Sequence, residues 1–295
     1  MSSTSNKDLA PFASAPVWLI TGCSTGFGRA LTTAVLERGH RAVVTARDPE
    51  SIQDLVAGRD GQALAIALDV TDRDQSEEAV AHAEKTFGRI DVLVNNAGIG
   101  YFGAIEESEE PEVRRMFEIN VFGLARMIHL VLPGMRKRRS GHVVNISSIG
   151  GLRSFPAVGY YNATKFAVNG LSEALALEVA PLGIKVTIIE PSGFRTDWAG
   201  RSANESPNEI ADYAETAGSN RRNLRGYSGN QPGDPVRAAE AIIKVVESKE
   251  PPLHLLLGKA ALGGARRKLD EMRKDFDAWE ETTVGADFPQ DEQKS

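Results

Sequence analysis

The sequence has little cysteine, no long apolar run and no excess of positive charge. Cys23 is the single cysteine among 295 residues, and one cysteine forms no intrachain disulfide, which excludes a disulfide-stapled secreted scaffold. No uninterrupted apolar stretch approaches the roughly 20 residues that a membrane-spanning helix needs. The net charge of −6 argues against a nucleic-acid partner. We therefore expect a cytoplasmic protein with no membrane or nucleic-acid partner.

Apolar strands instead alternate with amphipathic helical patterns along most of the chain. Strands are predicted at 17–21, 41–45, 63–68, 91–94, 142–146, 185–189 and 253–257. Helices are predicted at about 27–38, 73–87, 111–138, 161–180 and 235–247. Such alternation implies a parallel sheet covered by helices on both faces, and the strands are nearly continuously apolar, as doubly buried strands are. We predict an α/β three-layer sandwich around one seven-stranded parallel sheet.

Three segments depart from this alternation. Residues 1–15 are polar and lack the apolar core of a signal peptide, which predicts a disordered leader before a domain at 16–260. Within that domain, 197–232 is polar and long for a connection, which favours a substrate lid over a simple turn, with a short helix near 208–215. Residues 261–295 are predicted to form a charged helix, over 268–281, and a polar tail.

A glycine-rich loop follows the first predicted strand and opens the first helix. Gly22, Gly26 and Gly28 give the pattern G-x-x-x-G-x-G. A helix N-terminus offers unpaired N–H groups to an anion, and glycine lets the backbone approach a pyrophosphate closely. The position between a strand and a helix favours a cofactor site over a merely tight turn. Cys23 lies in this loop, as a small filler or as a thiol of lowered pKa, and we favour the filler.

The end of the second predicted strand indicates which dinucleotide is bound. NAD sites usually place an acidic residue there to bind the ribose 2′-hydroxyl. Here Ala46 aligns with that acid and Arg47 follows, and a guanidinium pairs well with a 2′-phosphate that a carboxylate would repel. Arg47, with the Ser24 hydroxyl, predicts NADP(H). A shift of the alignment to Asp48 would reverse this interpretation.

A tyrosine and a lysine share one face of the predicted helix at 161–180. Tyr161 and Lys165 are four residues apart, and a nearby ammonium group lowers the pKa of a phenol from ~10. The pair is then a usable acid/base group, although a surface cation beside a ring is the alternative. Ser148 ends a strand, where ligands bind in open parallel sheets. Asn120 lies in an apolar helix, where its amide group needs partners.

Together these motifs resemble the short-chain dehydrogenase/reductase family in its single-domain form, over about residues 16–258. The resemblance rests on the T-G-x-x-x-G-x-G pattern at 21–28, Asp69, the N-N-A-G pattern at 95–98, Asn120, Ser148, Tyr161 and Lys165. Ser148, rather than Ser147, has the family's usual spacing from Tyr161. The resemblance implies a Rossmann-like, doubly wound fold.

The resemblance also implies roles for the matching residues. Tyr161 would give a proton to a carbonyl oxygen or take one from an alcohol, Lys165 would lower the tyrosine pKa and hold the nicotinamide ribose, and Ser148 would bind the substrate oxygen. Asn120 would hold a water near Lys165. The implied cofactor contacts are Gly22, Ser24, Thr25, Gly26, Phe27, Gly28, Arg47, Asp69, Val70, Asn95, Ala97, Gly98, Tyr161, Lys165, Pro191 and Thr196. The chain departs from the family at Ser192, where a glycine usually follows the proline.

Apolar residues near these motifs predict an apolar carbonyl or alcohol substrate. Leu152, Tyr101, Phe155 and Trp198 are expected to line its pocket, although plain packing explains each equally well. We predict an NADP(H)-dependent oxidoreductase that interconverts a ketone or aldehyde and an alcohol, without a metal ion. The alternatives are a non-catalytic NADP-binding sensor and a dehydratase or epimerase on the same fold. The resemblance further implies a homodimer or homotetramer.

Overall fold

The structure is a computed structural model that describes residue 12 and residues 14–288. The predicted leader at 1–15 therefore lies almost wholly outside the described residues, as do residues 289–295 of the predicted tail.

One parallel sheet of seven strands organises the protein, in the order β3-β2-β1-β4-β6-β7-β9. The strands are β1 (Val17–Ile20), β2 (Arg41–Ala46), β3 (Ala63–Ala67), β4 (Val92–Asn95), β6 (Gly141–Ile146), β7 (Ile184–Pro191) and β9 (His254–Leu257). Each neighbouring pair is parallel. The order reverses between β1 and β4, which is where ligands bind in such sheets. The predicted Rossmann-like, doubly wound sandwich is confirmed.

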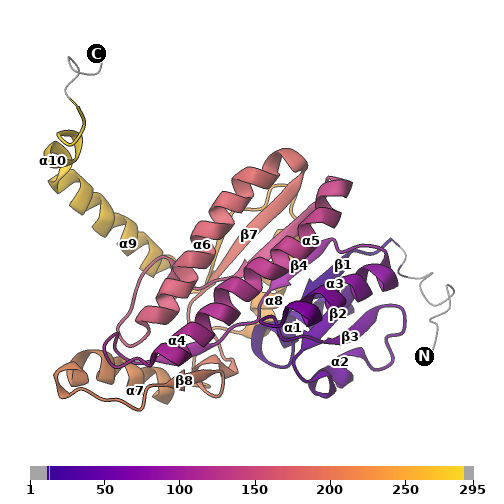
Figure 1. The fold of residues 1–295 in the computed structure, drawn as a ribbon, viewed down its shortest axis with the longest axis horizontal. Helices are drawn as coiled ribbons and strands as arrows, with labels where there is room; N and C mark the ends of the chain where they lie inside the picture. The colour runs from indigo at the N-terminus through magenta and orange to yellow at the C-terminus, as the bar shows by residue number, and fades with distance from the viewer. Residues whose placement is uncertain (1–11, 13, 289–295) are drawn as a thin grey trace.

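Side chains that alternate along the strands enter two separate cores. Val17 and Leu19 of β1 pack into one core, and Trp18 and Ile20 pack into the other, as the period of two in a strand requires. The helices over the first core are α3 (Arg73–Phe87), α5 (Leu124–Arg138) and α6 (Gly159–Val179). Those over the second are α1 (Gly26–Glu37), α2 (Gln53–Val56) and α8 (Pro235–Glu247). Figure 1 shows α5 and α6 running side by side across one face of the sheet.

Several elements were not predicted from the sequence. Strand β5 (Gly100–Phe102) pairs in parallel with β8 (Ala203–Glu205) as a separate two-stranded sheet. In the lid segment, η7 (Ala211–Tyr213) and the π-helical η8 (Ala214–Gly218) overlap the short helix predicted near 208–215, whereas η6 (Asp197–Ala199) and the longer α7 (Ser219–Gly226) were not predicted. Helix α9 (Lys259–Ala278) begins before the predicted residue 268, and α10 (Glu280–Val284) follows it. The other short helical turns are η2 (Pro49–Ile52), η4 (Ile149–Gly151) and η5 (Ala180–Leu182).

One continuous helical run passes through α4 (Glu110–Phe117), η3 (Glu118–Gly123) and α5. By length and composition alone this run of 29 residues could cross a membrane. Its side chains Met127, Val131 and Met135 are buried in the first core, which accounts for the apolar composition. The middle part, η3, is π-helical, a distortion that is frequent at functional sites.

A neutral histidine lies inside the sheet. His142 on β6 is 4% exposed, and its Nε2 lies 2.9 Å from Thr187 Oγ1 on β7. Burial, with a smaller contribution from the charge of Lys185, lowers the pKa of His142 to about 4. The folded protein therefore excludes a proton that the unfolded chain takes up near pH 6.5.

We expect His142 to make the stability depend on pH between 6.5 and 4. The folded-state pKa is depressed, so the contribution is fully present above pH 6.5 and is lost as the pH falls toward 4. At ~1.4 kcal/mol per pKa unit, the wild type should lose about 2 kcal/mol between pH 7 and pH 5 from this group. Urea unfolding of His142→Gln should lack that loss, while the exposed His82→Gln should retain it. Equal pH dependence in the wild type and His142→Gln would contradict this assignment.

Candidate active site

The glycine loop between β1 and α1 folds back on itself so closely that it excludes side chains. Gly22 and Gly26 have φ angles of +72° and +58°, which L residues with a Cβ rarely adopt. A Cβ on Gly28 would lie 2.3 Å from the Gly22 carbonyl oxygen and 2.5 Å from Asn96 Nδ2. The loop therefore packs its own backbone atoms against one another. A loop of this form can bind phosphate through its backbone N–H groups.

The N-terminus of α1 is open toward this loop. Thr25, the N-cap, makes no side-chain capping bond, and the first turn has no acidic residue, so its N–H groups keep their capacity for an anion. Thr196 lies against the same loop, because a Cβ on Gly26 would be 3.4 Å from Thr196 Cβ. Phe27 packs edge-on to Phe194 with ring centroids 5.0 Å apart. These residues fit the pyrophosphate of a dinucleotide.

Cys23 fills space in this loop. Its Sγ donates to the Ile20 carbonyl at 3.1 Å, and burial raises its pKa to about 11. A thiol of lowered pKa is therefore wrong here, since desolvation outweighs the positive end of the helix.

Asn96 and Thr21 brace the loop from the neighbouring strand end, a role that the sequence did not reveal. The Asn96 side chain donates to the carbonyls of Thr21 and Gly22 at 2.8 and 2.9 Å. Thr21 Oγ1 accepts from the backbone N–H groups of Asn96 and Ala97 at 2.9 and 3.0 Å. A Cβ on Gly98 would meet Asn120 Oδ1 at 3.2 Å. The segment 95–98 is thus fixed against the cradle on one side and η3 on the other.

At the end of β2 an arginine side chain is available to a ligand, whereas the neighbouring carboxylate is used in a helix cap. Arg47 is exposed and has no hydrogen-bond or ion-pair partner in the part of the chain that the structure describes. The Asp48 carboxylate is the N-cap of η2 and accepts from the Glu50 N–H at 3.1 Å. The charged side chain left available at this strand end is therefore the guanidinium group. Ser24 lies half-buried in the glycine loop.

The other predicted cofactor residues lie at the strand ends and make local contacts. Asp69 Oδ1 accepts from the N–H and hydroxyl of Thr71 at 2.9 and 2.7 Å, and Val70 is buried. Asn95 Nδ2 donates to Asn145 Oδ1 at 2.9 Å, inside the sheet. The Asn95 side chain therefore ties β4 to β6 and leaves only its Oδ1 without a partner.

The departure at Ser192 does not alter the cradle. Pro191 ends β7, and the Ser192 hydroxyl donates to the Leu257 carbonyl at 3.3 Å. A Cβ on Gly258 would lie 2.5 Å from Ser192 Oγ. The extra side chain is therefore accommodated at the edge strand β9, where Gly258 with φ +93° leaves room for it.

Ser148, Tyr161 and Lys165 come together at the carboxyl end of β6. Ser148 Oγ accepts from the Gly150 N–H at 3.0 Å, and the Ser148 hydroxyl lies close enough to the Tyr161 side chain to lower the pKa of its phenol. Lys165 Nζ lies 5.6 Å from the centroid of the Tyr161 ring and donates to the Ile146 carbonyl at 2.8 Å. Tyr161 and Lys165 are 8% and 6% exposed. The three predicted residues thus form one buried cluster.

Burial governs the proton affinities of this cluster. It raises the pKa of Tyr161 well above the ordinary value of 10.0, and the Ser148 hydrogen bond offsets this only in part. Burial lowers the pKa of Lys165 to about 8. The expected lowering of the Tyr161 pKa by Lys165 is not met in this structure, because both groups are desolvated and Nζ is held by a backbone carbonyl. Tyr161 is a protonated phenol at neutral pH, ready to donate.

The side-chain amide of Asn120 is hydrogen-bonded to other residues of the protein. Its Oδ1 accepts from the Ile99 N–H at 2.9 Å, and its Nδ2 donates to the Ile99 carbonyl at 2.9 Å and to Thr164 Oγ1 at 3.1 Å. Thr164 in turn donates to the Tyr161 carbonyl at 2.7 Å. Asn120 therefore joins the loop after β4 to α6. Both amide hydrogens are used, so only Oδ1 and the backbone carbonyl remain to accept a hydrogen bond from a water.

The lid lies directly over the tyrosine. The Trp198 ring, on η6, is 4.7 Å from the Tyr161 ring and 5.6 Å from the Phe102 ring. Within the lid, the Arg225 side chain on α7 donates to the carbonyls of Ala199, Gly200 and Ala203 at 3.0, 2.7 and 2.8 Å. Its guanidinium group also lies 4.8 Å from the centroid of the Phe102 ring on β5, outside the lid. The lid residue Trp198 thus covers Tyr161.

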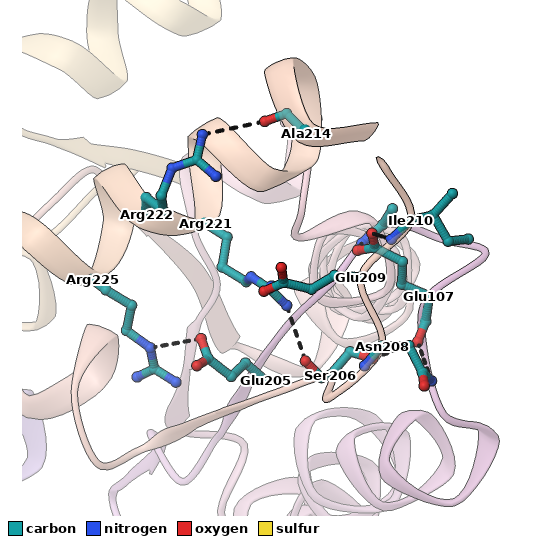
Figure 2. A network of polar contacts seen from close by, with 11 residues as sticks. Glu107, Glu205, Ser206, Asn208, Glu209, Ile210, Ala214, Arg221, Arg222 and Arg225 are labelled. Carbon is teal, nitrogen blue, oxygen red and sulfur yellow. Dashed lines mark hydrogen bonds and ion pairs between the residues drawn. The ribbon is translucent and has the colours of Figure 1, made fainter. Parts of the chain in front are cut away.

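A buried carboxylate ties the lid to the loop after β5, and sequence reasoning missed it. Glu107 Oε1 accepts from the Ile210 N–H at 2.9 Å, and Oε2 accepts from the Ala104 N–H at 2.8 Å. Burial alone would raise the pKa of Glu107, but these bonds and the charge of Arg221 lower it overall. Figure 2 shows Glu107 beside Ile210, and Arg221 reaching toward Ser206, whose carbonyl accepts at 3.0 Å.

The predicted pocket residues do not share one wall. Tyr101 and Trp198 pack around Tyr161, and the Tyr101 hydroxyl accepts from the Glu109 N–H at 3.2 Å. Leu152 packs instead against the base of α9. Phe155 lines a separate cavity of about 420 Å³, whose other lining residues include Ile105, Pro156, Ala157, Gly159 and the lid residues Tyr213, Thr216 and Ala217. This mostly apolar cavity adjoins the turn that leads into α6.

Comparison with known proteins places these features in a family. The short chain dehydrogenase model matches residues 16–207. Oxidoreductase BOA17 of Botryotinia fuckeliana is 38% identical over 92% of this chain and 98% of its own length. The 3-ketodihydrosphingosine reductase of Bacteroides thetaiotaomicron is 40% identical over 81% of this chain and 87% of its own. A short-chain dehydrogenase structure from Streptomyces avermitilis has a TM-score of 0.87 and 47% identity, covering 93% of this chain and 99% of that one. The chain belongs to the short-chain dehydrogenase family.

Structures in this family carry both kinds of nicotinamide dinucleotide. A Burkholderia phymatum member in complex with NAD has a TM-score of 0.78 and 25% identity, over 88% of this chain and 95% of that one. ElxO with NADP bound has a TM-score of 0.70 and 28% identity, over 84% of this chain and 99% of that one. The protein is therefore an oxidoreductase whose cradle fits NAD(P), and the comparisons do not choose between the two cofactors. The described residues contain no group of three or more His, Cys, Asp or Glu placed to hold a metal ion.

Gly28→Ala should damage the cradle and the fold together. The added Cβ meets backbone and a braced amide rather than a flexible side-chain end, so we expect a loss of about 1–3 kcal/mol in the free energy of unfolding and roughly tenfold weaker dinucleotide binding. Gly170→Ala in α6, where a Cβ meets nothing within 4 Å, should gain ~0.5–1 kcal/mol and bind normally. Urea unfolding and fluorescence titration measure both, and normal binding by Gly28→Ala would show that the loop is not the cradle.

Proposed function

We propose that the protein is an NADP(H)-dependent oxidoreductase that interconverts an apolar carbonyl compound and its alcohol, with Tyr161 as the acid/base group. The observation that carries this proposal is the buried cluster in which Tyr161 lies beside both Ser148 and Lys165. A sensor that only bound the dinucleotide would have no use for a desolvated phenol between a hydroxyl and an ammonium group.

The protein residues supply the proton and the polar contacts of the reaction. When bound, the reduced cofactor supplies the hydride. Tyr161, protonated because burial raises its pKa, donates its hydroxyl proton to the substrate oxygen. Ser148 releases Tyr161 and hydrogen-bonds the same oxygen, which stabilises the charge that develops there. Lys165, whose Nζ is within reach of the ring, favours the phenolate that remains.

The preference for NADP(H) rests on the end of β2. Arg47 is the available cation there, and the one nearby carboxylate, Asp48, caps η2. A guanidinium group binds a 2′-phosphate as a bidentate partner, and the half-buried Ser24 hydroxyl adds a donor on the glycine loop. An NAD-binding site would need a carboxylate where Ala46 stands.

The apolar nature of the substrate is inferred from the lid. Trp198 and Phe102 cover Tyr161, and the neighbouring cavity with Phe155 is mostly apolar. Since Tyr161 is buried under Trp198, η6 must move aside before a carbonyl group can reach the hydroxyl. A relative named for reducing a long-chain ketone, the Bacteroides enzyme, supports a substrate of this kind.

Tyr161→Phe should abolish turnover and leave NADPH binding nearly intact, because only the proton donor is lost. Tyr160→Phe is the matched control: the neighbouring ring lies about 100° away on the helix, so that variant should turn over normally. Rates with a panel of apolar ketones, together with NADPH titration, measure both properties. Full activity of Tyr161→Phe would refute the acid/base role, and a wild type that binds NADPH but reduces nothing would favour the sensor.

Arg47→Ala should weaken NADPH binding roughly tenfold or more, since a charged hydrogen bond contributes ~1.5–3 kcal/mol, and should leave NADH binding unchanged. Arg136→Ala, which removes an exposed arginine at the far end of α5, is the control for a general loss of positive charge. Titration of the intrinsic fluorescence of each reduced cofactor gives its dissociation constants for the wild type and for both variants. Equal losses for NADPH and NADH would show that Arg47 does not contact the 2′-phosphate.

A further inference from the structure

The last two helices form an arm that leaves the body of the protein. We call residues 259–284, which comprise α9 and α10, the C-terminal arm. Its base is buried: Ala261 and Ala265 pack against Ile149 and Leu152, and Glu271 lies 3.4 Å from Arg153. Beyond this point Figure 1 shows α9 and α10 extending away from the sandwich, beside no other described element.

The arm carries an apolar stripe that covers nothing in the described protein. Leu262, Leu269 and Phe276 follow one another at intervals of seven residues, and Met272 and Trp279 form a second column with the same interval. Leu269, Phe276 and Trp279 are 66%, 63% and 65% exposed. This heptad spacing places both columns on one face of a helix, as in helices that pack against another helix. A contiguous stripe of this kind marks an interaction surface.

Charge is distributed along the arm with opposite signs at its two ends. Four basic residues lie in the half nearer the body, Lys259, Arg266, Arg267 and Lys268, and two more, Arg273 and Lys274, lie just past the middle of the arm. The acidic residues of the outer half are Asp275, Asp277, Glu280 and Glu281. Only Asp270 and Glu271 fall within the basic half. The arm is therefore a dipole whose positive and negative charges are equal in number.

We propose that the C-terminal arm pairs with the arm of a second copy of this chain, antiparallel, with the apolar stripes in contact. Antiparallel pairing sets the basic half of each arm opposite the acidic half of its partner, whereas parallel pairing would set like charges together. The two-fold symmetry makes both halves of the contact equivalent. An arm that bound an anionic membrane would need an excess of positive charge on its polar face, and the balanced charge removes that attraction.

The stripe is long enough to hold two helices together. From Leu262 to Trp279 it runs for roughly 25 Å at ~1.5 Å per residue, and Leu269, Phe276 and Trp279 within it are more than half exposed. Centring the charge pattern places the two-fold axis near Arg273. This pairing is independent of the reaction proposed above, because the stripe contains none of the catalytic residues.

The first test is the mass of the full-length protein by sedimentation equilibrium. Leu269→Asp with Phe276→Asp should lower the weight-average mass of the wild type by half, because the arms are the contact that joins the two copies. Ala278→Asp introduces the same side chain on the exposed arm but off the stripe, and should leave the mass unchanged. Circular dichroism checks that the helices persist. A wild type that is a monomer of 31.8 kDa, or a mass unaffected by the double variant, overturns the proposal.

Charge reversal tests whether the charges on the two arms contribute to their pairing. Arg266→Glu, Arg267→Glu and Lys268→Glu together give the arm a large negative net charge. Asp275→Lys, Asp277→Lys and Glu280→Lys together give it a large positive one. Each triple variant should dissociate alone, and an equimolar mixture should recover the wild-type mass. A mixture that stays dissociated overturns the electrostatic pairing. Binding of the wild type to phosphatidylserine vesicles without self-association would assign the stripe to a membrane instead.

Cysteine cross-linking locates the axis, because Cys23, the only native cysteine, is buried. Arg273→Cys at the centre should form a disulfide-linked dimer on mild oxidation. Glu281→Cys, at one end, should not link to itself but should link to Arg266→Cys in a mixture of the two variants. Self-linking by Glu281→Cys would establish parallel arms and overturn the antiparallel arrangement.

Discussion

The close contact between the glycine loop and Asn96 is the constraint on which the cofactor site depends. Gly28 lies where any side chain would strike the Gly22 carbonyl and the Asn96 amide, and that amide holds two successive carbonyls of the loop. The contact fixes the start of α1 against the end of β4 and keeps the first-turn N–H groups free of side-chain caps. The topology supplies the rest, because β1 and β4 flank the point where the strand order reverses.

The proton affinity of Tyr161, beside Ser148 and Lys165, depends on a second constraint, which is the balance between burial and charge. Tyr161 and Lys165 were expected to interact chiefly as a cation and a phenol. In the closed structure, desolvation by Trp198 and the surrounding aromatic side chains outweighs that interaction and raises the pKa of the phenol. Opening of the lid would let water reach both groups and shift the balance back toward the ion pair. The lid position and the proton affinity of Tyr161 are therefore linked.

The sequence predicted correctly the elements that depend on residues close together in the chain. The apolar strands, the helix at Arg73–Phe87 and the glycine loop follow from periodicity and from chemistry within a few residues, and the structure has them within one or two residues. Ser148, Tyr161 and Lys165 were brought together by family resemblance, since periodicity does not show that a strand end and a helix meet. The structure places them in one cluster.

What could not be predicted depends on contacts between distant polar residues. Strand β5 pairs with β8 across about a hundred positions, and Glu107 binds the Ile210 N–H over a similar separation. Nothing in a short acidic stretch distinguishes this carboxylate from a solvated one. Leu152 was placed in the pocket because it follows Ser148, yet the opposite side of that turn is covered by α9.

The position of α9 joins the arm to the catalytic cluster through a single turn. Ser148 is the N-cap of η4, and its Oγ accepts from the Gly150 N–H. Ile149, the first residue of the same turn, packs on Ala261 and Ala265 at the base of the arm. A turn of three residues has few internal hydrogen bonds, so its conformation is set by what covers it. The base of the arm is therefore part of what holds the Ser148 hydroxyl at the tyrosine, and a partner that steadied the arm would steady that hydroxyl as well.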